Sequence, residues 1–226
     1  MKEEKDPLAA AGPEPLSVNR SEALSDGIYA VAMTLLVIDL KLPDAAALHA
    51  SNDVLNGLVA LLPKALAWVM SFFVLSLFWL GHHRVFNHVR HVDSTVLVWN
   101  LFQLACVSLM PFSSALIGEA AGSFAAQVVY STNMALLGIA ALAISRHVYR
   151  HPELTRASIP MASYRGARLR VAGVIVVSIV AVILAMVANR PGIGSYAFAL
   201  MLVIVPLSRA LERRERARES HARQAA

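Results

Sequence analysis

Imidazole groups crowd one short stretch of the chain, HHRVFNHVRH, which spans residues 82–91. Its histidines are His82, His83, His88 and His91. Imidazole binds metals and titrates near neutral pH, so the cluster could serve a metal, a haem or a pH response. The spacing is not the His-Glu-x-x-His of zinc proteases, and no second cluster accompanies it as in membrane di-iron enzymes. We therefore expect no metal site. A membrane metal or haem enzyme that uses the His82–His91 cluster stays as the second alternative function.

Charged and hydroxyl side chains also mark the stretch RSEALSDGIYAVAMTLLVIDL at residues 20–40. Arg20, Ser25 and Asp26 precede an apolar run that Thr34 interrupts. Acidic residues at membrane depth are candidate functional groups because charges are costly in hydrocarbon. As a helix, the chain rises about 22 Å from Asp26 to Lys41, which predicts that these two charges lie near opposite faces of the membrane.

Small and β-branched side chains recur on one face of this predicted helix at spacings of four, three and four residues: Gly27, Val31, Thr34 and Ile38. Lys41 continues the stripe. Such a stripe usually packs against other membrane helices. Asn19 and Glu22 have the spacing of a capping box, which predicts Asn19 as the N-cap. Asp26 is expected to pair with His82 or His83, as part of a structural network.

The composition requires a membrane for these elements. The chain of 226 residues is 57% hydrophobic and 15% charged, with a mean hydropathy of +0.58, and is too apolar for an ordinary soluble domain. Its single cysteine excludes an intrachain disulfide. The basic residues lie between apolar runs, so the high isoelectric point reflects membrane topology, and no nucleic-acid partner is expected.

Six apolar runs divide the chain, and each is about long enough to cross a hydrocarbon core of about 30 Å as a helix. They are residues 25–42, 58–80, 95–118, 124–145, 169–188 and 193–207. All but three of the 20 Lys and Arg residues, namely Lys41, Lys64 and Arg190, fall on one side of these spans. The positive-inside rule therefore predicts that both termini are cytoplasmic.

The predicted fold is an all-α polytopic membrane protein with six transmembrane helices. Residues 1–19 are predicted to be a disordered cytoplasmic arm, residues 20–208 the transmembrane domain and residues 209–226 a basic cytoplasmic tail. Mixed charge at the N-terminus argues against a signal peptide. Asn100, Gln103 and Asn133 are expected to make interhelical hydrogen bonds, and Pro111 to kink the third helix.

Several of these residues resemble the first-helix signature of the prokaryotic transmembrane protein 175 family of potassium channels, which is Arg, three residues, then Phe-Ser-Asp. Arg20, Ser25, Asp26 and Gly27 match it, with Leu24 in the position of the Phe. Thr34 and the Asp-Leu-Lys-Leu-Pro that ends the run also fit, as do the segments GHHRVFNHV and VWNLFQLACVSLMPFSSALIGE. The resemblance covers six helices, from residue 20 to about residue 208.

The resemblance implies a homotetramer that conducts potassium passively through a pore of four first helices, with a hydrophobic constriction in place of a carbonyl filter. It places the constriction on Val31, with Thr34 and Ile38 beyond. We expect Val31 and Ile38 to form the gate and Thr34 to contribute to coordination of the cation or to discrimination between cations. Gly27, Leu35 and Lys41 are further candidates for the pore stripe. The structural network is expected to comprise Arg20, Ser25, Asp26, His82 and His83.

The expected partners are potassium ions, further copies of the chain and membrane lipid. No enzyme activity and no cofactor are expected. The first alternative function is a secondary cation or proton-coupled transporter, although no inverted repeat is visible in the sequence. The composition, rich in Ala and Arg, suggests a multi-pass protein of the bacterial cytoplasmic (inner) membrane.

Overall fold

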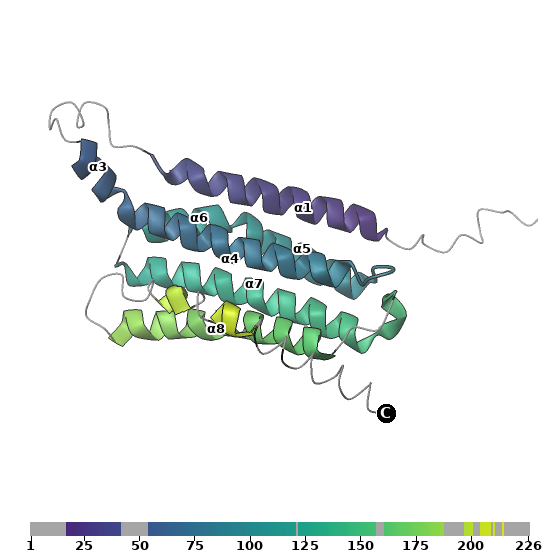
Figure 1. The fold of residues 1–226 in the computed structure, drawn as a ribbon. Helices are drawn as coiled ribbons and strands as arrows, with labels where there is room; N and C mark the ends of the chain where they lie inside the picture. Colours follow the sequence, from purple (N-terminus) through teal and green to yellow (C-terminus); the bar gives the residue numbers. More distant parts are fainter. Residues whose placement is uncertain are drawn as a thin grey trace, which may run out of the picture.

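The computed structural model describes residues 17–41, 54–120, 122–156, 161–187, 197–200 and 204–208, with residues 210 and 214. Its helices run side by side, with α1 along one side of the bundle, α8 along the other, and α4 to α7 between them (Figure 1). The bounds are α1 Val18–Leu35, η1 Leu36–Asp39, α3 Val54–Ala60, α4 Leu62–Phe86, α5 Ser94–Ser108, α6 Met110–Glu119, α7 Phe124–Arg150, η2 Pro152–Leu154, α8 Met161–Val187 and η3 Ala197–Leu200.

Five segments of the described chain are long and apolar enough to cross a membrane: Val18–Ile38, Leu62–Phe86, Ser94–Glu119, Phe124–Arg150 and Tyr164–Val187. They correspond to the first five predicted runs, so the prediction of an all-α polytopic membrane protein is confirmed. The sixth run, residues 193–207, is described only in part. Within it are η3 and the start of the helical residues 204–208.

The ends of the helices follow local side-chain chemistry only in part. Asp93 caps α5, because its carboxylate accepts a 2.8 Å hydrogen bond from the backbone N–H of Val96. The predicted capping box at Asn19 is wrong. The N-cap of α1 is Ser17, which makes no side-chain capping bond, and Asn19 lies inside the first turn.

Pro111 divides the third span as expected. The helix is interrupted at Leu109 between α5 and α6, and the proline stands in the first turn of α6. Proline has no backbone N–H to continue the hydrogen bonds of a helix. It is tolerated in the first turn of α6, because the N–H groups there have no partner within the helix. The third helix is therefore interrupted near the predicted position, and a change in its direction stays a prediction.

Close packing rather than hydrophobic burial must hold these helices together, because lipid tails are as apolar as the side chains themselves. A large cluster of buried side chains contains residues of α1, α4, α5, α6, α7 and α8. Tyr29, Leu75 and Met134 are among its most completely buried members. Helices α7 and α8 approach each other closely at Gly138. A Cβ atom built on Gly138 would lie 2.8 Å from Cγ1 of Ile175.

This approach generates a prediction about stability. Gly138→Ala should destabilise the protein by about 1–3 kcal/mol, because the new methyl group overlaps a side chain that is stiff at χ1. Thermal unfolding in detergent measures the change. Gly81→Ala is the matched control, since its Cβ meets no atom within 4 Å. Adding Ile175→Ala should restore the Gly138→Ala variant, and an equal effect of the two alanine variants would contradict the packing argument.

Candidate functional site

Helix α1 has two faces of different character. One carries the buried side chains Ser21, Ser25, Tyr29, Ala32 and Leu36. On the opposite face Val31 is 57% exposed and Ile38 is 59% exposed, and Gly27 and Thr34 are exposed beside them. Among the described residues, the stripe expected from the sequence is therefore the exposed face of α1.

The hydroxyl group of Thr34 is oriented by its own helix. Its Oγ1 donates a 2.8 Å hydrogen bond to the backbone carbonyl of Val31. A hydroxyl that donates in this way keeps its oxygen lone pairs for another group. Thr34 can therefore offer an acceptor oxygen on the exposed face.

The remaining stripe candidates lie around this face. Leu35 is 41% exposed, at the edge of the face. The 3-10 helix η1 ends at Asp39, so Lys41 is exposed beyond the helix rather than on it. Arg20 is exposed at the other end of α1, and it takes part in none of the hydrogen bonds found among the described residues around Ser25 and Asp26.

A buried polar network fixes the other face of α1. Oγ of Ser25 donates to the carbonyl of Ser21 at 2.8 Å and accepts from Nδ2 of Asn100 at 3.2 Å. Oδ1 of Asn100 lies 2.9 Å from Nε2 of His82. The three side chains come from α1, α5 and α4, and all are buried. The expected interhelical hydrogen bond of Asn100 is thus confirmed.

Aromatic rings extend this network along α1. The imidazole of His82 stacks on the ring of Phe86, with centroids 4.1 Å apart. One turn further along α1, the hydroxyl of Tyr29 accepts a 3.0 Å hydrogen bond from Nε2 of Gln103. Asn100 and Gln103 of α5 therefore hydrogen-bond to two successive turns of α1, at Ser25 and at Tyr29. The rotation of α1 about its axis is fixed by these contacts.

Asp26 has a partner that the sequence did not single out. Nε1 of Trp79 donates a 2.8 Å hydrogen bond to Oδ1 of Asp26, and the ring of His83 stacks against Trp79. His82 is directed to Asn100 instead. Trp79 lies near the end of the apolar run, where indole rings are common at membrane interfaces. Its position one turn before His83 was the available signal.

The other histidines serve local structure at this end of the bundle. Nδ1 of His88 lies 2.8 Å from the carbonyl of Arg84. Nε2 of His147 lies 2.7 Å from Oδ2 of Asp93. Partial burial acts to raise the pKa of Asp93, but the hydrogen bonds from Val96 and His147 outweigh it and hold that pKa below its usual range. Among the described residues, no three His, Cys, Asp or Glu side chains are grouped as a metal would require.

Comparison with known proteins identifies the family. The family model described as the endosomal/lysosomal potassium channel TMEM175 matches residues 20–111, which contain every member of the network. A protein of Streptomyces collinus that is named a potassium channel is 34% identical over 157 residues, covering 68% of this chain and 75% of that protein. The chain belongs to the TMEM175 family. The resemblance found in the first helix is confirmed.

Further relatives of this TMEM175 family member agree. A protein of Chamaesiphon minutus named a potassium channel is 36% identical over 107 residues, which is 47% of this chain and 52% of that protein. The crystal structure of a lysosomal potassium-selective channel TMEM175 homolog from the same organism is 26% identical, with a TM-score of 0.66 over 84% of this chain and 97% of that one. The endosomal/lysosomal proton channel TMEM175 of Rattus norvegicus is 38% identical over 104 residues, which span 44% of this chain but only 21% of that protein.

The buried network generates a first prediction for the site. Asn100→Ala should destabilise the protein by about 1–3 kcal/mol, because Ser25 and His82 lose a partner where water cannot replace it. Unfolding in detergent measures the loss. Asn87→Ala, at an exposed asparagine after α4, should change stability by less than about 0.5 kcal/mol. Similar losses in the two variants would contradict the network's role.

The contact between Asp26 and Trp79 generates a second prediction. Asp26→Ala and Trp79→Phe should each lower the recovery of folded protein in size-exclusion chromatography, because each breaks the same hydrogen bond between α1 and α4. The double variant should be little worse than the worse single variant, since coupled residues are not additive. Glu22→Ala, at the other acidic residue of α1, is the control. Additive losses would show that the two residues act separately.

Proposed function

We propose that this member of the TMEM175 family is a potassium-permeable cation channel that conducts passively through a pore formed by four copies of α1. The observation that carries the proposal is the two-faced α1, which is anchored by Ser25 and Asn100 while its Val31–Ile38 face is exposed among the described residues. A helix that is held on one side and bare on the other suits a position around a central axis. The names of both bacterial relatives support potassium as the permeant ion.

The chemistry of the bare face fits a hydrophobic gate. In a four-fold ring, the Val31 and Ile38 side chains would exclude water, and an ion cannot shed its hydration shell without replacement ligands. Thr34 lies between these rings, and its hydroxyl oxygen supplies such a ligand. Gly27 leaves the pore wider toward the end that carries Arg20. Val31 and Ile38 are therefore the gate, and Thr34 contributes to the choice of ion.

The proposed topology has six spans with both termini in the cytoplasm of a bacterial cell. It is supported by contacts between two loops that the positive-inside rule assigns to one side. The backbone N–H of Arg90 donates to the carbonyl of Leu154, and that of Arg156 donates to the carbonyl of His88. The sixth span and the basic tail at residues 209–226 complete this arrangement, with residues 1–19 as the N-terminal arm.

A second candidate is a proton pathway, because the Rattus norvegicus relative is named a proton channel. The same bare face of α1 would serve it, with water entering past Val31. A secondary cation or proton-coupled transporter remains the other alternative. The two channel functions differ in the ion that carries current, and the transporter differs in needing a second, coupled gradient.

Ion flux into liposomes that contain the purified full chain tests the proposal. A potassium gradient drives flux, with sodium and proton gradients in parallel. We expect flux that prefers potassium, an increase of about tenfold in Val31→Asn because a wetted ring lowers the barrier by about 1.4 kcal/mol, and an altered ratio of potassium to sodium flux in Thr34→Ala.

Matched controls lie on other helices. Val176 on α8 is 57% exposed, the same fraction as Val31, and Thr95 is exposed at the start of α5. Val176→Asn and Thr95→Ala should leave flux and ion preference unchanged. If the two α1 variants behave like these controls, α1 does not line the pore. Flux carried only by protons would favour the second candidate.

A further inference from the structure

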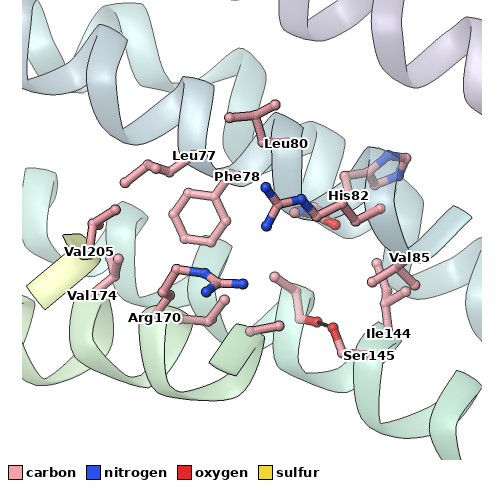
Figure 2. A pocket seen from close by; sticks show the side chains of 16 residues that line it. Leu77, Phe78, Leu80, His82, Val85, Ile144, Ser145, Arg170, Val174 and Val205 are labelled. Atoms are coloured by element: carbon pink, nitrogen blue, oxygen red, sulfur yellow. Dashed lines mark hydrogen bonds between the residues drawn. The ribbon is translucent and has the colours of Figure 1, made fainter. Parts of the chain in front are cut away.

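A cavity lies between α4, α7 and α8, away from the bare face of α1 (Figure 2). Its volume is ≈ 60 Å³, which is room for several water molecules or methylene groups. The wall is largely apolar, with Phe78, Val174 and Val205 among its members. The function proposed above does not use this space.

Both charged side chains that line the cavity are arginines, Arg84 from α4 and Arg170 from α8. Figure 2 shows the guanidinium of Arg170 directed into the space beside the ring of Phe78. Guanidinium groups present a planar fork of donors that matches the oxygens of a phosphate. The cavity therefore joins two phosphate-binding groups to an apolar wall.

Both arginines lie near the same end of the bundle, where long basic side chains can extend toward the membrane surface. Arg84 lies two residues before the end of the span Leu62–Phe86, and Arg170 lies six residues after the start of Tyr164–Val187. At 1.5 Å per residue these positions are about 3 Å and about 9 Å inside their spans, at the same end of the bundle. Basic pockets between helices near the membrane surface bind anionic lipid headgroups.

We propose that this cavity binds one anionic phospholipid, with its phosphate on Arg84 and Arg170 and an acyl chain along Phe78, Val174 and Val205. His82 and Gln103 also line the cavity. His82 also hydrogen-bonds to Asn100, and Gln103 hydrogen-bonds to Tyr29. A bound lipid therefore touches the residues that set the rotation of α1.

Lipid binding to the delipidated full chain tests the site without reference to ion conduction. Native mass spectrometry follows titration with dioleoyl phosphatidylglycerol or with dioleoyl phosphatidylcholine. We expect the anionic lipid to bind more tightly, and the double variant Arg84→Gln with Arg170→Gln to lose about tenfold in affinity for each arginine removed. Arg90→Gln with Arg150→Gln removes two exposed arginines outside the cavity and should change the affinity less than twofold.

A second variant tests the acyl chain separately and guards against a charge variant that fails to fold. Gly81 lines the cavity, and a Cβ added there meets no atom within 4 Å. Gly81→Leu should fill the space and weaken lipid binding about tenfold with the folded protein intact, whereas Gly81→Ala should bind as the wild type does.

Four results would overturn the proposal. The first is an unchanged lipid affinity in both Gly81→Leu and the double variant of Arg84 and Arg170, and the second is equal binding of the two lipids. The third is an equal loss of affinity in that double variant and in the control double variant of Arg90 and Arg150. The fourth is binding of glycerol phosphate as tight as that of the whole lipid. The last result would assign the arginines to a free phosphate rather than to a lipid.

Discussion

Polar groups inside a membrane must find their partners within the protein, and the arrangement of this bundle depends on that constraint. Ser25, His82 and Asn100 come from three different helices, and each is nearly inaccessible to solvent. Their hydrogen bonds are satisfied together in only one rotation of α1 against α4 and α5. Once that rotation is set, the face that carries Val31 and Ile38 can point only away from the bundle.

The same constraint recurs through the rest of the molecule. Asn133 of α7 donates to the carbonyl of Cys106 and to the hydroxyl of Ser113. Ser71 lies 3.1 Å from the hydroxyl of Tyr130, which ties α4 to α7. Interhelical hydrogen bonds in membranes are individually worth about 0.6 kcal/mol on average, so their main effect is to select one register. Close packing, as at Gly138, then supplies the contacts between α7 and α8.

Charge is concentrated where the helices end. Asp93 caps α5 and contacts His147 of α7, and nearby loop backbones pair with one another. The cavity lined by Arg84 and Arg170 is also lined by His82, which belongs to the polar network that contacts α1.

Local patterns in the sequence determined the first five spans and the two faces of α1, because hydropathy and helical period depend only on neighbouring residues. The helix interruption near Pro111 followed for the same reason. Tertiary structure decided which partners the polar groups found. Asp26 bonds to Trp79 rather than to a histidine, and His82 joins Asn100, since each choice depends on how α1 and α4 are rotated about their axes. The N-cap of α1 is Ser17 rather than the predicted Asn19. The cavity between α4, α7 and α8 could not be predicted, because helices that are distant in sequence meet only after folding.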